Sequence, residues 1–175
     1  STLTITLATG QSLTLDSLTD GDTAAASLAD GGIAIASSSL TSLDLILDDV
    51  GPSTSTANEN IFIDIAGAGI TTAKVTIEND SFVVISNSGG ALAGLELLGS
   101  GTLALGTLPN SLTNINGAAA TANLTLTLGA GANTITGGVG DDAITLTGGT
   151  NNVNTGAGND TISTIQKDWL AQLRQ

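Results

Sequence analysis

Acidic and amide side chains recur at a fixed interval in the last third of this chain. Asp142 and Asp160 hold the sixth position of two nine-residue blocks, and Asn133 and Asn151 hold the sixth position of two others. Glycines precede them, and glycine permits tight turns in which backbone carbonyls approach a common point. Short carboxylates among converging carbonyls are the oxygen ligands that a hard cation such as Ca²⁺ prefers. The pattern therefore indicates cation binding rather than acid–base catalysis.

The nine-residue register continues without insertion through four consecutive blocks, at residues 128–136, 137–145, 146–154 and 155–163. Position four is always Gly, and position eight is always Ile or Val. One block is too short to bury its aliphatic side chain, but stacked blocks bury these side chains in a continuous ladder. We therefore expect short stacked strands around a thin core, to which a bound metal adds stability.

One block carries the repeat in complete form. Its residues are Gly137-Gly138-Val139-Gly140-Asp141-Asp142-Ala143-Ile144-Thr145. They match G-G-x-G-x-D-x-U-x at every fixed position, which is the pattern of the calcium-binding repeats of RTX (repeats-in-toxin) proteins. Block 155–163 departs from the pattern only in Thr155 at its first position. The last quarter of the chain therefore resembles RTX proteins, and residues 112–128 resemble the segments that precede such repeats in bacterial surface-layer proteins.

The RTX resemblance implies a parallel β-roll in which each coil takes two blocks. Asp142 and Asp160 then share one edge of the roll, and Asn133 and Asn151 share the opposite edge. The resemblance implies one calcium ion between the turns 137–142 and 155–160, bound first by the two carboxylates. Backbone carbonyls complete the expected ligand set, namely those of Gly137, Val139, Gly140, Thr155, Ala157 and Gly158.

Weaker candidates and one alternative stand beside this site. The neutral amides of Asn133 and Asn151 are poorer calcium ligands, and Asp20 and Asp22 form a second acidic turn that lacks the spacing of an EF-hand loop. In the alternative interpretation, the Asp and Asn side chains only cap their turns through backbone hydrogen bonds. Because the carboxylates are few, the expected dissociation constant for calcium is on the order of 10⁻⁴–10⁻³ M.

The remaining sequence predicts the strands that position these turns. Apolar and polar residues alternate at residues 3–7, 13–15, 32–35, 43–47, 61–65, 74–77, 82–85, 94–98 and 102–105. We predict an all-β protein, with a sandwich-like or irregular sheet over residues 1–90 and a parallel β-helix or β-roll over residues 91–163. Ile165, Trp169 and Leu173 recur every four residues, which predicts a short capping helix over residues 164–175.

Composition excludes several classes of function. The chain has 16 acidic residues and three basic ones, a net charge of −13, so nucleic acid is excluded as a partner. The chain has no Cys and no His, which removes disulfides, thiolate metal sites and the commonest general base. No apolar stretch is long enough to span a bilayer, so we expect no membrane insertion. Because no nucleophile elbow, phosphate loop or zinc motif is present, we expect no enzyme.

These observations favour a secreted calcium-binding structural protein, a homo-oligomer or polymer that self-assembles into an extracellular fibre, biofilm matrix or surface layer. The RTX resemblance implies type I secretion, in which case residues 164–175 belong to the secretion signal as well as to the cap. Two alternatives stay open. One is an adhesin module that binds glycan on a cell surface, or ice through rows of threonines. The other is the non-catalytic RTX domain of a larger secreted protein.

Overall fold

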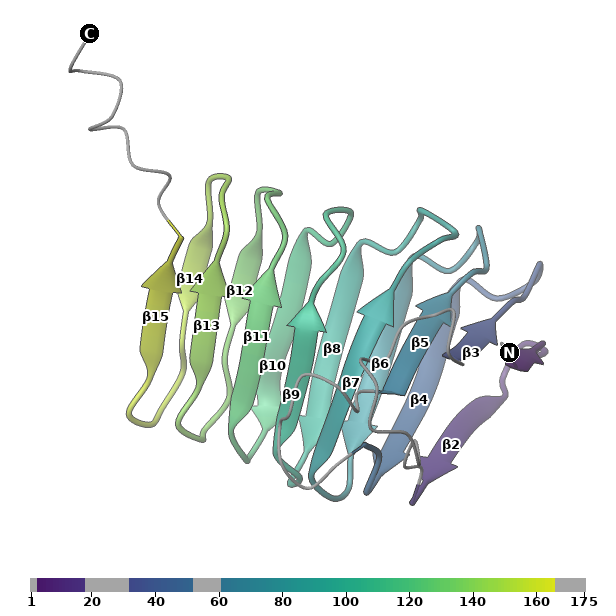
Figure 1. Ribbon diagram of the computed structural model, residues 1–175, viewed down its shortest axis with the longest axis horizontal. Coiled ribbons are helices and arrows are strands. Elements are labelled where there is room, and N and C mark those ends of the chain that lie inside the picture. Colours follow the sequence, from purple (N-terminus) through teal and green to yellow (C-terminus); the bar gives the residue numbers. More distant parts are fainter. Residues whose placement is uncertain (1–2, 18–31, 52–60, 166–175) are drawn as a thin grey trace, which may run out of the picture.

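The computed structural model describes residues 3–17, 32–51 and 61–165, and the structural statements below concern these residues. They form fifteen β-strands and no helix, so none of their segments is a helix that could cross a membrane (Figure 1). The all-β prediction is confirmed. Thr164 ends a strand, so the predicted capping helix does not begin there, and the rest of that prediction, at residues 166–175, lies outside the described residues.

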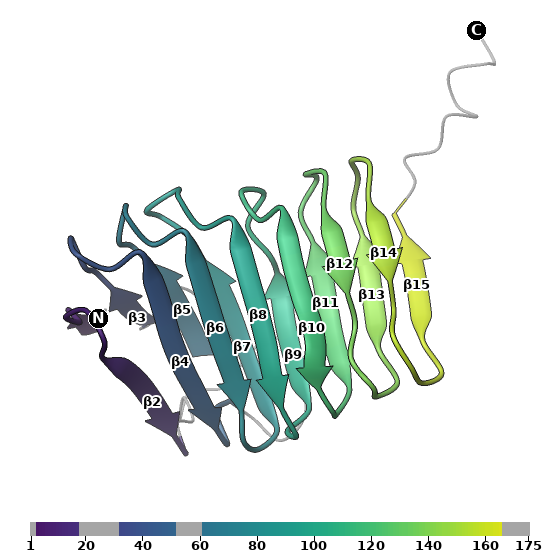
Figure 2. The ribbon, with the colours of Figure 1, turned by 180° about the vertical axis from the view of Figure 1, so that it is seen from behind.

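The odd-numbered strands form one sheet and the even-numbered strands form a second. The odd sheet contains β1 (Leu3–Ile5), β3 (Gly32–Ile35), β5 (Ile61–Ile65), β7 (Ser81–Ser86), β9 (Leu103–Thr107), β11 (Leu124–Leu128), β13 (Ala143–Leu146) and β15 (Thr161–Thr164). The even sheet contains β2 (Ser12–Asp16), β4 (Ser42–Asp48), β6 (Thr72–Ile77), β8 (Gly94–Gly99), β10 (Asn114–Ala120), β12 (Thr134–Thr136) and β14 (Asn152–Asn154). Figure 2 views the even sheet from the front, whereas Figure 1 views the odd sheet.

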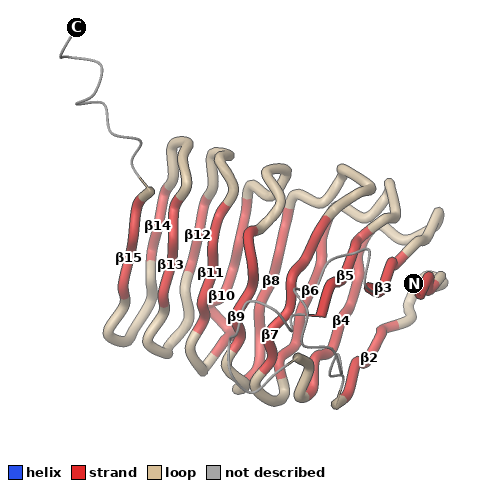
Figure 3. Tube along the Cα trace, in the orientation of Figure 1, coloured by secondary structure: helices blue, strands red, loops and turns tan. Residues whose placement is uncertain are grey.

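The chain winds as a parallel β-solenoid. It passes from one sheet to the other at every turn, so each coil adds one strand to each sheet (Figure 3). Every strand pairing in both sheets is parallel. The predicted parallel β-helix or β-roll is therefore present in the C-terminal half, with two nine-residue blocks in each coil.

The N-terminal half differs from the sandwich-like or irregular sheet expected over residues 1–90. The same two parallel sheets run through it, and β8 joins β6 to β10 without a break at residue 90. Coil length explains why the sequence concealed this. Aligned residues Ile5, Ile35 and Ile65 are 30 residues apart, whereas Leu126 and Ile144 are 18 apart. Long N-terminal coils carry no short repeat, although they stack in the same way.

The core lies between the sheets and consists of aliphatic side chains stacked in columns. One column follows the odd sheet through Val83, Leu105, Leu126, Ile144 and Ile162. The first four of these side chains are at most 3% exposed. Alternate residues of each strand point inward because successive side chains of a strand face opposite ways. The expected aliphatic ladder is thus present, and it extends well beyond the nine-residue repeats.

Glycine at position four of the blocks lets one coil lie directly on the preceding one. Gly149 has φ +75°, and a Cβ at this residue would lie 1.9 Å from the carbonyl oxygen of Gly131, eighteen residues earlier. Gly158 has φ +125°, and its Cβ would lie 2.2 Å from the carbonyl oxygen of Gly140. Side chains at these positions would therefore force the coils apart.

Replacing Gly149 with Ala tests this requirement against a matched glycine. Gly90 has the same φ of +75°, but nothing lies within 4 Å of its Cβ position. Gly90→Ala should cost only the left-handed backbone conformation, about 1–2 kcal/mol. Gly149→Ala should cost clearly more in urea unfolding, because the methyl group also meets a backbone oxygen. Equal losses in the two variants would contradict the close-stacking explanation.

Asp64, near the end of β5, is a buried carboxylate that ties two coils together. It is 9% exposed, and its Oδ1 accepts hydrogen bonds from Ser86 Oγ at 2.9 Å and from Ser88 N at 2.9 Å. Ser88 Oγ donates to the other carboxylate oxygen. Burial raises the pKa of Asp64, but the hydrogen bonds from Ser88 and Ser86 outweigh it and hold the pKa below the usual 3.8. The ionised form is therefore the one that the fold stabilises.

The depressed pKa of Asp64 predicts a dependence of stability on pH. The contribution of Asp64 is complete above the unfolded-state pKa and is lost as pH falls through the lower folded-state pKa. Asp64→Asn should lower the free energy of unfolding by about 1–3 kcal/mol at pH 7. This difference should shrink well below pH 3.8. Asp44→Asn, which makes the same charge change within β4, is the control. A difference that stays constant across the acid range would be inconsistent with this role.

Candidate metal site

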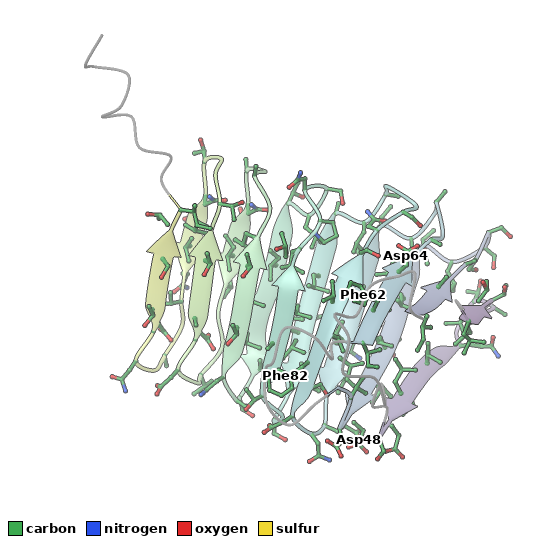
Figure 4. All side chains as sticks on the ribbon, in the orientation of Figure 1. Asp48, Phe62, Asp64 and Phe82 are labelled. Carbon is green, nitrogen blue, oxygen red and sulfur yellow. The ribbon has the colours of Figure 1, made fainter. Side chains whose placement is uncertain are left out.

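Most carboxylates of the described residues lie along one edge of the solenoid, where the even strands end and the odd strands begin. We call this edge the acidic edge. It carries Asp16, Asp48, Asp49, Glu78, Asp80, Asp141, Asp142 and Asp160. The opposite edge has Asp64 as its one described carboxylate, and Figure 4 shows Asp48 and Asp64 at opposite edges. Such a row of one sign concentrates cations along that edge.

The structure brings Asp142 and Asp160 together on the acidic edge. They immediately precede Ala143 and Thr161, which are partners in adjacent strands. The backbone N–H of Asp142 donates to Asp160 Oδ1 at 2.9 Å. Asp142 is 1% exposed, because it continues an inward column whose preceding members are Leu103 and Leu124. A carboxylate therefore stands at the margin of the core, in a column that is otherwise aliphatic at these coils.

Backbone N–H groups satisfy the buried carboxylate of Asp142. Oδ2 accepts from Gly138 N at 2.8 Å, within the same turn, and Oδ1 accepts from Leu124 N at 2.9 Å, on the preceding coil. The turn-capping role considered as an alternative is thus present. An ionised carboxylate has about four lone-pair sites, so two hydrogen bonds leave acceptor capacity for a cation.

A second ladder runs beside this one at the fifth position of the blocks. Asp141 N donates to Asn123 Oδ1 at 2.9 Å, and Asn159 N donates to Asp141 Oδ1 at 2.7 Å. These side chains accept from the following coil, whereas Asp142 and Asp160 accept from the preceding one. Sequence reasoning missed this ladder, although Asn or Asp every 18 residues at position five was a visible signal.

Two of the carbonyls expected as ligands lie against glycines of the neighbouring coil. A Cβ on Gly137 would lie 2.0 Å from Thr155 O and 2.6 Å from Asp142 Oδ2. The carbonyl oxygen of Gly140 has the same relation to Gly158, as described for the fold. Oxygen atoms of both turns thus approach the backbone at positions that only glycine permits.

Two other residues of the predicted set also lie in these turns. Val139 N donates to Ala120 O at 3.1 Å, and Ala157 N donates to Gly138 O at 3.0 Å. Both hydrogen bonds join a turn to the coil before it. The backbone N–H groups of Val139 and Ala157 therefore fasten the turns, and their carbonyls remain as predicted ligands.

The donor chemistry of these turns fits a hard cation. Carboxylate and carbonyl oxygens are the ligands that Ca²⁺ takes, usually six to eight of them. Within residues 3–17, 32–51 and 61–165, no three acidic side chains gather around one point. An ion held by Asp142 and Asp160 would therefore need backbone carbonyls, including those of Thr155 and Gly140, to complete its coordination.

The asparagine pair is placed on the opposite edge, and its amides are occupied. Asn133, 6% exposed, donates from Nδ2 to Gly131 O and to Asn151 Oδ1, both at 3.0 Å. Asn151 Nδ2 donates to Gly148 O at 2.8 Å. These amides act as donors to the very carbonyls that a cation would need, so the pair suits turn capping. The other weak candidates, Asp20 and Asp22, lie outside the described residues.

Asp160→Asn separates the cation from the hydrogen bond, because Asn keeps an oxygen for Asp142 N and loses the charge. At about 10 mM calcium, the expected affinity predicts a gain in stability of about 1.4–2.7 kcal/mol for the unaltered chain. Asp160→Asn should lose most of this gain in thermal unfolding.

Asp80→Asn is the matched control for that substitution. Asp80 also lies on the acidic edge and accepts from Thr102 N at 2.8 Å, so the same charge is removed and the same kind of hydrogen bond is kept. This variant should retain the calcium gain. Melting that does not respond to calcium in the unaltered chain, or an equal loss in both variants, would sink the Asp142–Asp160 site.

The chain matches no protein-family model, no curated protein and no solved structure. Its function therefore has to be argued from the residues and the fold. The observations available for that argument are the parallel solenoid, the acidic edge and the open ends of the two sheets.

Proposed function

We propose that this chain is a secreted, non-catalytic structural protein that binds calcium and self-assembles into an extracellular fibre, biofilm matrix or surface layer. The observation that carries the proposal is the stacking of Asp142 on Asp160 along the acidic edge of a parallel solenoid. A solenoid of this kind extends by adding coils, and each added coil repeats the same edge. Divalent cations along that edge offset the repulsion that stacking creates.

Secretion and calcium are linked in this proposal by concentration. A site with a dissociation constant on the order of 10⁻⁴–10⁻³ M is empty in a calcium-poor cytosol and filled outside the cell. Unfilled, the acidic edge keeps its full negative charge, which lowers the stability of the stacked coils. Type I secretion, which the RTX resemblance implies, fits a chain that becomes fully stable only after export.

The threonine arrangement supports the structural role over ice binding. Thr127 pairs with Thr145 on the odd sheet, whereas Thr134 and Thr136 belong to the even sheet. The hydroxyl of Thr147 donates to Leu128 O at 2.7 Å, within a turn. The threonines are thus divided between two opposite faces and one edge, and they do not form one flat row. A glycan-binding adhesin, or a non-catalytic domain of a larger secreted protein, remains the alternative.

Electron microscopy of the purified chain tests the proposal. Ordered polymers should form in calcium at about ten times the expected dissociation constant and should disperse when a chelator is added. The control is magnesium at equal concentration, because Mg²⁺ demands a more regular octahedral site and should support assembly poorly. Particles that remain monomeric in calcium would refute self-assembly. Binding to a glycan array by such monomers would then favour the adhesin.

A further inference from the structure

Large apolar side chains are exposed at the two ends of the solenoid. The described residues expose four of them, Leu3 (60%), Val139 (56%), Ile162 (47%) and Ile165 (61%). Leu3 belongs to the first coil, Ile162 belongs to the last coil, and Ile165 follows directly after it. Only Val139 lies elsewhere, in the turn before β13.

Leu3 and Ile162 are exposed although they point inward. Leu3 is aligned with Ile33, which is 8% exposed, and Ile162 is aligned with Ile144, which is 1% exposed. The two end residues therefore continue buried columns and lack only the next coil. Leu13 and Val153, on the terminal strands of the even sheet, are likewise only partly buried against the core.

The strand edges at the two ends are complementary. Among the described residues, β15 and β14 have a neighbour on one side only, and so do β1 and β2. All strands of a sheet run in the same direction, so the free side of β15 resembles the side that each odd strand presents to the next one. The free side of β1 resembles the side that receives it. Charged or proline residues, which protect natural sheet edges, are absent from β1, β14 and β15.

We propose that a second copy of this chain docks head to tail on these ends, so that β15 of one copy pairs with β1 of the next, and β14 pairs with β2. This rests on the proposed self-assembly and specifies its contact. Every coil-to-coil contact within the chain is already of this parallel kind, so the joint repeats an existing interface. Joining like ends would instead require antiparallel pairing, which neither sheet contains. A head-to-tail contact does not close on itself and therefore yields a filament.

This orientation aligns the acidic edges of successive copies. Negative charge therefore continues across each joint, which opposes assembly at low ionic strength. Cations that bind along the edge reduce that repulsion, so the joint and the cation dependence of the proposed function agree. Register shifts of two residues keep the apolar side chains inward, and the columns allow such shifts without exposing the core.

Lysine at either end tests the contact, because inward-pointing charge blocks strand addition. Leu3→Lys and Ile162→Lys should each be monomeric in calcium by sedimentation velocity, and each should melt as the unaltered chain does, because both side chains are already largely exposed. Val139→Lys is the matched control, and it should still polymerise. An equimolar mixture of Leu3→Lys and Ile162→Lys should form heterodimers and stop there, since one intact end of each kind remains.

Each other outcome has a definite meaning. Dimers of Leu3→Lys alone would show tail-to-tail contact, and dimers of Ile162→Lys alone would show head-to-head contact; either overturns the proposal. Polymers that form despite both substitutions would show lateral contact, which overturns this inference and leaves the proposed function standing. No assembly of the unaltered chain would overturn both. If the chain 1–165 then polymerised, residues 166–175 would be the occupant of the C-terminal end.

Discussion

Hydrogen bonding between coils fixes a spacing of about 4.8 Å along the whole solenoid, and most other features follow from that distance. Coils this close leave no room for a Cβ at Gly149 or Gly158, whose Cβ positions overlap carbonyl oxygens of the coil before. The same spacing places equivalent residues of successive coils beside one another. Ile144 therefore lies on Leu126, and Asp160 lies on Asp142. A favourable or unfavourable contact made once is thus repeated at each coil.

The polar residues of the turns resolve a problem that this stacking creates. Where the chain leaves one sheet and enters the other, its backbone N–H groups have no strand to pair with, and buried N–H groups need partners. Asp142 accepts from the coil before it, and Asp141 accepts from the coil after it. Neighbouring turns are therefore joined in both directions. Alternate Asn and Asp residues at position five suffice for this, so a metal ion is not needed to hold the turns in place.

The sequence was most informative where the coils are shortest. The blocks from residue 128 onward predicted the parallel roll, the two-block coil and the adjacency of Asp142 and Asp160. The N-terminal coils were missed because periodicity can be recognised only when the repeat length is constant. Spacing changes there from 30 residues between Ile35 and Ile65 to 22 between Ile63 and Ile85. The acidic edge was also missed, since Asp48 and Glu78 share it only through a topology that those coils conceal.

Hydrogen bonds and charge have different roles at the Asp142–Asp160 pair. The N–H groups of Leu124 and Gly138 orient the Asp142 carboxylate, but they do not cancel its charge. Two carboxylates about 4.8 Å apart repel each other by roughly 1–3 kcal/mol for effective dielectric constants of about 80 to 20. Asparagine in both positions would avoid this cost, as the pair Asn133 and Asn151 does on the other edge. Hydrogen bonding alone therefore does not account for aspartate at both positions, whereas a cation that needs anionic ligands does.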